Sequence, residues 1–328
     1  MITIYDTATG SLNLGDQIIM QAVSNHVHEM FPEETLMHFP THYTLSSHTL
    51  QRAWIPQLAF VGGTNLLQAK RRMRARKNQW SLGIIDAYRM TPAILMGCGW
   101  NNYNKSLNKT AIFFYKKALN SNFFQSVRDQ FTLNILKQYG IENVLNTGCP
   151  TLWNLTPQLL SQISLIKSKK VVFTLTDYSQ HVDADIELII QLSKNYSELI
   201  YWPQGSDDLK YFSTLHKKLP RSEAESIQIL PRSLYAFDEL LNQQDIDYVG
   251  TRLHAGIRAL QKGCRSIIIG IDNRSLEMKK DMNLPVVERE QISTVSNLLN
   301  QPLKLEEISI PFEAIKTWKS QFVNAVHF

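Results

Sequence analysis

Short apolar runs alternate with segments of helical periodicity along the whole chain. The apolar runs predict β-strands at residues 2–5, 58–61, 93–96, 124–127, 171–175, 198–202, 227–230, 247–250 and 266–271. Between them, residues 17–30, 110–119 and 237–241 carry apolar side chains at the spacing of one helix face. Strands that alternate with helices form parallel sheets covered by helices on both faces, so we expect an α/β fold.

The alternation is interrupted once, by a polar and Lys-rich passage between residues 155 and 170. With 328 residues, the chain also exceeds what one hydrophobic core usually serves. We therefore predict two doubly wound, Rossmann-like domains, at residues 1–160 and 168–305. Residues 306–328 are predicted to contain a helix, at 312–323, that packs back on the domains.

Composition indicates where the protein works. The sequence has no run of about 18 apolar residues that could form a transmembrane helix. Its first residues predict a β-strand instead of a signal peptide. Cys98, Cys149 and Cys264 lie far apart and form no CxxC pair, which argues against a cysteine zinc site and favours a reducing compartment. We expect a cytoplasmic protein.

The net charge of +5 is mild, but basic residues concentrate at positions 70–77. One interpretation is a solvated surface. The other is attraction of an anionic acceptor, or of lipid headgroups, which would bring the protein to the inner membrane face as a peripheral protein. A nucleic-acid partner is not expected, because aromatic residues are not interleaved with the basic ones.

The segment best suited to chemistry is Asp247–Leu260. A predicted strand runs into Thr251, and a predicted helix continues to Gly263, which suits a C-cap. Arg252 and His254 are therefore expected where the strand ends and the helix begins, outside the deep core. Backbone N–H groups and the helix dipole favour a phosphate or carboxylate there. Arg252 could bind that anion, and His254 could transfer a proton. Alternatively, Arg252 pairs with a nearby Asp and His254 is a satisfied structural residue.

Other polar residues also follow predicted strands. Arg274 comes after the strand at 266–271, with Asp272 or Asn273 as the cap of the next helix. Arg128 comes after the strand at 124–127, with Asp129 as the expected cap. Adjacent parallel strands deliver their loops side by side, so we expect Arg274 to share a crevice with the residues after Thr251.

Glycine-containing turns in the first half offer further candidates. Gly15 allows a tight turn before the first long helix, and Asp16 is the expected N-cap. A second turn, Gly62-Gly63-Thr64, follows the strand at 58–61 and allows close approach of a ligand to the backbone. For Asp16, capping alone is a sufficient explanation.

Several catalytic motifs are missing from the sequence. It contains no Walker A, HExxH or GxSxG motif and no carboxylate-rich metal loop. Gly97-Cys98-Gly99 lacks the third glycine of a dinucleotide loop, so NAD binding is rejected. The sequence therefore favours transfer chemistry with no metal and no cofactor.

Taken together, these segments resemble the polysaccharide pyruvyl transferase family. The resemblance spans roughly residues 1–290 and is most specific at Thr251-Arg252-Leu253-His254-Ala255. The other matching segments are Asn13-Leu14-Gly15-Asp16, Gly62-Gly63-Thr64, Ser126-Val127-Arg128-Asp129 with Thr132, Leu136 and Gly140, Gly148-Cys149-Pro150-Thr151, Gly263, and Ile268-Ile269-Gly270-Ile271-Asp272. The resemblance implies a fold similar to the GT-B glycosyltransferases, in which two domains face each other across a cleft.

The resemblance also implies transfer of pyruvate from phosphoenolpyruvate to a pair of sugar hydroxyls, which gives a cyclic ketal. The acceptor would be a polysaccharide or its lipid-linked oligosaccharide precursor. His254 is the expected general acid. The expected donor-binding residues are Arg128, Arg252, Leu253 and Arg274, with the second domain on the donor side. The expected acceptor-binding residues are Asn13, Asp16, Gly62, Gly63 and Thr64, on the side of the first domain.

One departure from the family pattern leaves other functions open. Many members carry a Lys in the loop after the strand that ends at Asp272, whereas this chain has Asn273-Arg274. Arg274 supplies a cation there, but a donor other than phosphoenolpyruvate stays open. The alternatives are a GT-B glycosyltransferase that uses a nucleotide sugar and a non-catalytic polysaccharide-assembly protein.

Overall fold

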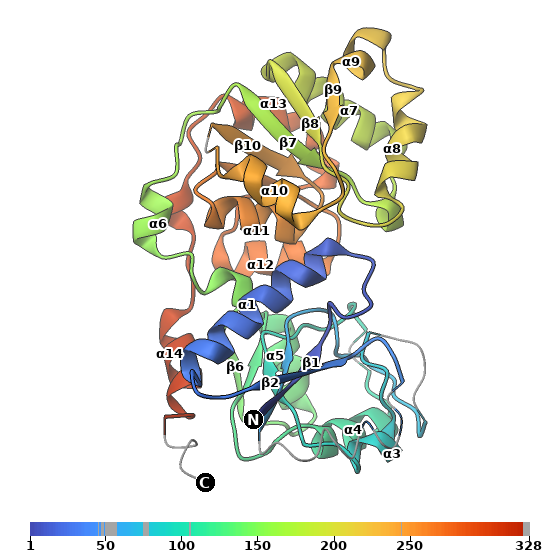
Figure 1. Cartoon of the computed structure of the whole chain (residues 1–328), viewed down its shortest axis with the longest axis vertical. Coiled ribbons are helices and arrows are strands. Elements are labelled where there is room, and N and C mark those ends of the chain that lie inside the picture. Colours follow the sequence, from blue (N-terminus) through green and yellow to red (C-terminus); the bar gives the residue numbers. More distant parts are fainter. Residues whose placement is uncertain are drawn as a thin grey trace. The chain divides into compact units, whose positions relative to one another are not determined.

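The computed structural model describes residues 1–44, 46, 49, 58–74, 79–104, 106–243 and 245–323. Contacts divide the chain into two compact units (Figure 1). Unit 1 contains Met1–Ser11, Ile19–Trp153 and the segment from Ile310 onward, and unit 2 contains Leu12–Ile18 and Asn154–Ser309. The change from unit 1 to unit 2 after Trp153 thus precedes the predicted boundary. Leu12–Ile18, which the prediction gave to the first domain, group with unit 2.

Unit 1 is built on parallel strands. β1 (Ile2–Asp6), β2 (Leu36–Pro40), β3 (Leu58–Gly62) and β4 (Ile94–Met96) form a sheet in the order β2-β1-β3-β4. A second pair, β5 (Gln125–Val127) and β6 (Val144–Asn146), is also parallel. A parallel bridge between Cys98 and Val127 joins β5 to the chain that leaves β4. The strand order of unit 1 therefore continues as β2-β1-β3-β4-β5-β6.

The helices of unit 1 are α1 (Leu14–Met30, whose first turn belongs to unit 2), α3 (Ile84–Ala87), α4 (Lys109–Ala118), α5 (Gln130–Gln138) and α14 (Phe312–Ser320). α14 packs on unit 1, because Trp318 Nε1 donates to the Phe124 carbonyl at 2.8 Å. The ring of Phe322 lies 5.3 Å from that of Phe60 in β3. The predicted C-terminal helix therefore packs on unit 1, and residues 324–328 lie outside the described chain.

Unit 2 contains a six-stranded parallel sheet in the order β12-β11-β10-β7-β8-β9. Its strands are β7 (Lys170–Thr174), β8 (Glu198–Tyr201), β9 (Ile227–Ile229), β10 (Ile246–Gly250), β11 (Ser266–Gly270) and β12 (Val286–Glu288). The chain progresses outward from β7 to β9 and then returns to the other side of β7. This is the doubly wound order whose switch point, here between β7 and β10, opens a crevice at the carboxyl ends of the strands.

The helices of unit 2 are α6 (Pro157–Ser161), α7 (Val182–Asn195), α8 (Asp208–His216), α9 (Arg221–Ser226), α10 (Leu234–Leu241), α11 (Leu253–Gln261), α12 (Asn273–Met282) and α13 (Val295–Leu299). The end of α11 follows the expected pattern. Gly263 has φ +80°, its N–H donates to the Leu260 carbonyl at 3.0 Å, and Cys264 N–H donates to the Ala259 carbonyl at 2.9 Å. These two bonds form a Schellman motif, so the predicted C-terminal glycine is confirmed.

Two of the predicted caps are confirmed and one is wrong. Asp129 accepts from Thr132 N–H at 2.7 Å, and Asp272 accepts from Arg274 N–H at 3.0 Å. Asp16 is not a cap, because α1 already begins at Leu14. It lies in the first turn instead, where a carboxylate interacts favourably with the helix dipole.

Candidate active site

The predicted turn after β10 places Arg252 at the N-cap position of α11. Its side chain is only 3% exposed. Nε donates to the Leu175 carbonyl at 3.3 Å and to Asp208 Oδ2 at 3.1 Å. Nη2 donates to Asp177 Oδ1 at 2.7 Å and also contacts Asp208 Oδ1. Of the two interpretations of Arg252, pairing with an Asp is therefore observed, and the pairing involves two carboxylates.

Asp208 is the central acceptor of this cluster. It is fully buried, and its carboxylate accepts the backbone N–H groups of Asp177 at 3.0 Å, Gln204 at 3.0 Å and Gly205 at 2.7 Å. Together with its ion pair to Arg252, these bonds connect the loops that follow β7, β8 and β10. One carboxylate thus fixes the three loops around the switch point of the sheet.

Asp177 is the more accessible partner, with a side chain that is 21% exposed. Burial and the neighbouring Asp208 raise the pKa of Asp177, while Arg252 opposes that rise. Burial alone would lower the pKa of Arg252, but the two carboxylates outweigh it, so the pKa is raised and the guanidinium stays charged. The single positive charge of Arg252 is therefore shared between the carboxylates of Asp177 and Asp208.

Tyr178 connects Arg252 with Arg274. The Cζ atom of Arg252 lies 5.0 Å from the centre of the Tyr178 ring. Arg274 Nη2 donates to the Tyr178 hydroxyl at 2.7 Å, and Arg274 Nε donates to Asp272 at 2.9 Å. Tyr178 itself is 58% exposed. Arg252 and Arg274 therefore contact the same exposed tyrosine, Arg252 at its ring and Arg274 at its hydroxyl.

Leu253 and His254 are the first two residues of α11 and are 6% and 5% exposed. The expected position at a strand-to-helix turn is correct, but the His254 side chain is buried, so the expectation that it lies outside the core is wrong. The turn before it is held by a hydrogen bond that the Tyr248 hydroxyl donates to the Arg252 carbonyl at 2.7 Å.

Arg128 lies in unit 1, whereas Arg252 and Arg274 lie in unit 2. Its side chain is 1% exposed, and Nη2 lies 3.1 Å from Asp129, which also caps α5. Nη1 donates to Asn65 Oδ1 at 2.9 Å. A Cβ atom at Gly99 would lie 2.2 Å from this guanidinium, so only glycine leaves room for it. Arg128 is therefore packed and charge-balanced inside unit 1.

The predicted acceptor residues are divided between the two units. Asn13 and Asp16 belong to the part of the chain grouped with unit 2. Asn13 Oδ1 accepts from Gly15 N–H at 3.0 Å and from Gln204 Nε2 at 2.8 Å, and Asn13 also bridges to Gly205. Asn13 thus contacts the same loop after β8 whose backbone is bound by Asp208.

The other predicted acceptor residues, Gly62, Gly63 and Thr64, lie in unit 1. A Cβ atom would lie 2.3 Å from Val23 at Gly62 and 2.7 Å from Ile19 at Gly63. Both glycines therefore permit close packing of α1 against the end of β3. Thr64 is buried, and its carbonyl accepts from Gly99 N–H at 2.9 Å.

Three residues of the site were not assigned to donor or acceptor binding from the sequence: Asp177, Tyr178 and Asp208. A signal for them existed, because each follows a predicted strand. Asp177 and Tyr178 come just after β7, and Asp208 comes after β8 at the start of α8. Applying the same strand-end criterion to all strands of unit 2 would have included them among the candidates, although it does not separate Asp208 from the adjacent Asp207.

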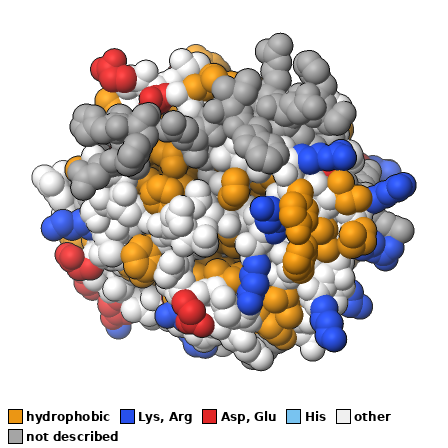
Figure 2. Space-filling view, turned by 90° about the horizontal axis from the view of Figure 1, so that it is seen from below, with side chains coloured by type: hydrophobic (Ala, Val, Ile, Leu, Met, Phe, Trp, Pro, Cys, Tyr) orange, Lys and Arg blue, Asp and Glu red, His pale blue; other side chains and the backbone are white. Residues whose placement is uncertain are grey.

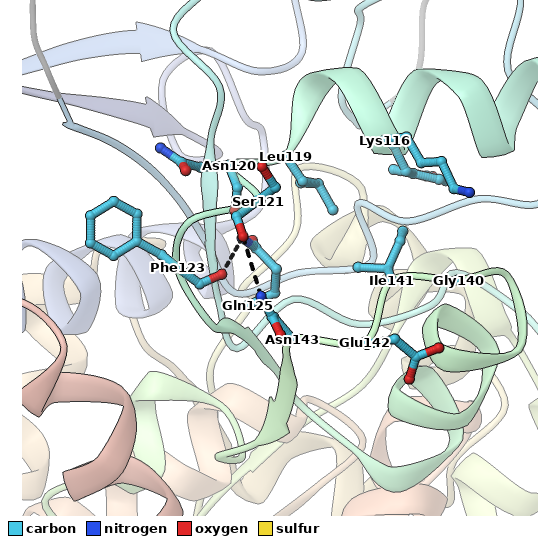
Figure 3. Close-up of a pocket in the computed structure, with 11 residues that line it drawn as sticks. Lys116, Leu119, Asn120, Ser121, Phe123, Gln125, Gly140, Ile141, Glu142 and Asn143 are labelled. Atoms are coloured by element: carbon cyan, nitrogen blue, oxygen red, sulfur yellow. Dashed lines mark hydrogen bonds between the residues drawn. The ribbon is translucent and has the colours of Figure 1, made fainter.

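Figure 3 shows a pocket of about 220 Å³ in unit 1, which lies neither at the carboxyl ends of strands nor beside a cluster of arginines. Gln125 Nε2 donates there to the carbonyls of Asn120 at 2.6 Å and Phe123 at 3.2 Å. The pocket lies by the first residue of β5 and the residues just before β6, at the amino ends of these strands. Its lining includes one Lys and one Glu, so it has no net positive charge to attract an anionic donor.

The basic segment at 70–77 is partly buried and partly exposed. Arg71 is 3% exposed, and its guanidinium donates to the carbonyls of Trp80 at 2.7 Å and Leu66 at 2.8 Å. The interpretation as a uniformly solvated run is therefore wrong at Arg71. Lys70, Arg72 and Arg74 are exposed, whereas Arg76 and Lys77 lie outside the described residues.

Within the described ranges, no group of three or more His, Cys, Asp and Glu side chains is placed to hold a metal ion. The same part of the chain contains no helix with the length and apolar character needed to cross a bilayer.

Comparisons with known proteins address both family and fold. The family model described as polysaccharide pyruvyl transferase matches residues 13–273. No match is found among curated proteins. The chain is similar in structure to S. aureus MnaA, solved with UDP, at 12% identity and a TM-score of 0.57, covering 99% of this chain and 95% of that one.

A second similar structure is the UDP-GlcNAc 2-epimerase of Methanocaldococcus jannaschii, solved with UDP-GlcNAc and UDP. It has 12% identity and a TM-score of 0.50, and the match covers 97% of this chain and 99% of that one. At this identity the likeness concerns the fold alone. It confirms the predicted α/β fold of GT-B type with Rossmann-like units.

Proposed function

Because the chain belongs to the polysaccharide pyruvyl transferase family, it is a transferase, and we propose that it moves pyruvate from phosphoenolpyruvate to a sugar. The acceptor is a polysaccharide or its lipid-linked precursor, and the product is a cyclic ketal on two sugar hydroxyls. This proposal replaces the alternative of a non-catalytic assembly protein.

The observation that supports the proposal best is the cluster at the carboxyl ends of β7, β10 and β11. Arg252 and Arg274 both contact Tyr178, and His254 is the second residue of the helix whose N-cap position Arg252 occupies. Ligands of doubly wound sheets bind at this edge. Phosphoenolpyruvate carries a phosphate and a carboxylate, and two guanidinium groups suit such a pair of anions.

The charge balance of the cluster suggests how the donor enters. Asp208 is buried and bound by three backbone N–H groups, so its displacement would destabilise the fold, whereas Asp177 is partly exposed. We therefore assign Asp177 as the group that an incoming anion displaces from Arg252. Its raised pKa favours this exchange, because a protonated Asp177 leaves Arg252 with less competing negative charge.

The proposed reaction uses His254 as general acid. Transfer of its proton to C3 of phosphoenolpyruvate turns the CH₂ group into a methyl group and makes C2 electrophilic. One sugar hydroxyl adds to C2, the C2–O bond to phosphate breaks, and the second hydroxyl closes the ketal. One of the two hydroxyl protons returns to His254, and the other goes to the phosphate, which leaves with the electron pair of the broken bond.

The finer assignments of the remaining residues are part of the same proposal. Leu253 and Arg128 are proposed to complete the donor site. Asn13, Asp16, Gly62, Gly63 and Thr64 are proposed to face the acceptor. Exposed basic residues such as Arg72 and Arg74 would favour peripheral association with the cytoplasmic face of the inner membrane.

A second candidate function has support from the fold. The similar structures were solved with UDP or UDP-GlcNAc. A GT-B glycosyltransferase with a nucleotide-sugar donor would place its diphosphate at the same helix start. Thermal shift separates the two, because a ligand at 100 times its Kd stabilises the native state by about 2.7 kcal/mol. A shift with a nucleotide sugar and none with millimolar phosphoenolpyruvate would replace our proposal.

Substitution of His254 tests the mechanism. A positioned general acid contributes roughly 10²- to 10⁴-fold, so His254→Ala should lower kcat by about that factor. Arg252→Ala should mainly raise KM for the donor, because it removes a contact made in both ground and transition states.

His26→Ala is the matched control, because His26 is also buried, at 1% exposure, and is hydrogen-bonded to Glu29 and Pro150. It should cost stability and leave kcat unchanged. A folded His254→Ala enzyme with wild-type turnover would show that the acid is another group.

A further inference from the structure

One surface of unit 1 carries concentrated positive charge. Residues 70–117 contain eleven Lys and Arg residues and a single acidic residue, Asp86. Asp86 accepts the N–H of Gly83 at 2.8 Å at the start of α3. In the described part of this segment, the exposed cations are Lys70, Arg72, Arg74, Arg89, Lys109, Lys116 and Lys117. Their charge is therefore almost uncompensated within the segment.

Large apolar side chains are exposed among these cations. Met73 is 57% exposed, Ile85 37%, Tyr88 49% and Phe113 47%. Ile85 N–H donates to the Met73 carbonyl at 3.2 Å, and the rings of Tyr88 and Phe113 lie 6.1 Å apart. We call these four residues and the seven cations the α3–α4 patch. Figure 2, which views the molecule from the end where α3 and α4 lie, shows hydrophobic side chains interspersed with Lys and Arg.

The interior of unit 1 determines which side chains the patch presents. Arg71 is turned inward, with its Cζ atom 4.6 Å from the centre of the Phe114 ring. This anchors the segment and leaves its neighbours exposed. On α4, Ala111, Phe114, Tyr115 and Ala118 are buried. Lys109, Phe113, Lys116 and Lys117 therefore share the opposite face, as in an amphipathic helix.

We propose that the α3–α4 patch binds the surface of an anionic phospholipid bilayer. Cations next to apolar and aromatic side chains form the combination that holds a protein in the headgroup region. Stacking of a nucleobase or sugar is less favoured, because Lys117 Nζ lies 4.9 Å from the centre of the Tyr88 ring and covers one face of it. The inference concerns unit 1 only and does not depend on the donor or acceptor.

Vesicle co-sedimentation tests the proposal on the full chain. The protein should bind vesicles of phosphatidylcholine that contain about 40 mol% phosphatidylglycerol, because anionic headgroups attract Lys and Arg side chains. It should not bind vesicles of phosphatidylcholine alone. Lys116→Glu with Lys117→Glu should lower the partition coefficient by about tenfold or more, because each cation near the surface contributes to binding. Tyr88→Ser with Phe113→Ser should lower it by about threefold or more through lost apolar contact.

The matched control is Lys217→Glu with Lys218→Glu, two exposed lysines at the end of α8 in unit 2. It makes the same change in net charge and should bind like the wild type. The proposal is overturned if anionic vesicles do not bind, if the control loses as much binding as the patch variant, or if the aromatic variant binds normally. The last result would identify a surface for soluble polyanions. Circular dichroism melting confirms that each variant is folded.

Discussion

Replacement of Asp208 by Ala tests the proposed centre of the site most directly. The Asp208 carboxylate accepts three backbone N–H groups and pairs with the buried guanidinium of Arg252. The Ala variant leaves these donors without their acceptor while the surrounding loops stay buried. Because the loops follow three different strands, we expect the damage to extend across the switch point of unit 2.

The size of the effect follows from these contacts. A buried donor left without a partner costs about 1–3 kcal/mol, and loss of one partner of a buried ion pair costs about 3–5 kcal/mol. These costs overlap, and Asp177 still contacts Arg252, so we expect the free energy of unfolding to fall by about 4 kcal/mol in total. For a unit of this size each kcal/mol lowers Tm by roughly 2–4 °C, which gives a fall of about 8–16 °C.

The assay is thermal unfolding followed by circular dichroism, with Asp207→Ala as the matched control. Asp207 is the adjacent residue, and it is exposed. Its replacement should change stability by less than about 0.5 kcal/mol. If Asp208→Ala melts within about 2 °C of the Asp207→Ala variant, Asp208 does not hold the loops together and our description of the site is wrong.

Two further predictions concern carboxylates whose pKa is raised. Asp177→Asn should lower KM for phosphoenolpyruvate by up to about fivefold in steady-state kinetics, because it removes the carboxylate that competes for Arg252; an increase would argue that Asp177 helps to bind the donor. Burial raises the pKa of Asp185 above its ordinary value of 3.8, although the hydrogen bond from the Tyr211 hydroxyl opposes this rise. As the pH rises above that value, ionisation of Asp185 therefore lowers the stability of the folded state. Asp185→Asn should therefore raise Tm at pH 7 and have little effect below about pH 4. Asp183→Asn, an exposed control in the same helix turn, should not raise Tm at either pH.

The sequence was informative about the strands because most of them are buried. All nine predicted strands occur, with ends within one residue of the prediction. The three that were missed, β2, β6 and β12, lie at the ends of their sheets. Such strands are short or partly exposed, as the mixed burial of Leu36–Pro40 shows, so they lack the continuous apolar run of a central parallel strand.

The location of Arg252 could be predicted, but its partners could not. A strand followed by a helix is a local pattern, and the local pattern determines where the turn lies. The carboxylates that bind Arg252 are 44 and 75 residues away in the sequence. The order of the strands brings them together, and no local feature of the sequence distinguishes Asp208 from the exposed Asp207 beside it.

The carboxylate partners of Arg128, Arg252 and Arg274 differ in exposure, and this difference bears on how much each arginine would contribute to donor binding. Burial of a guanidinium is costly unless it is hydrogen-bonded or paired with a carboxylate, and each of the three arginines proposed for the donor site has a carboxylate partner. The partner of Arg128 is Asp129, which is 2% exposed and is also needed to cap α5. The partners of Arg252 and Arg274 include Asp177 and Asp272, which are 21% and 23% exposed. A donor anion can replace a partly exposed carboxylate at lower cost than a buried one, so we expect Arg252 and Arg274 to contribute more to donor affinity than Arg128.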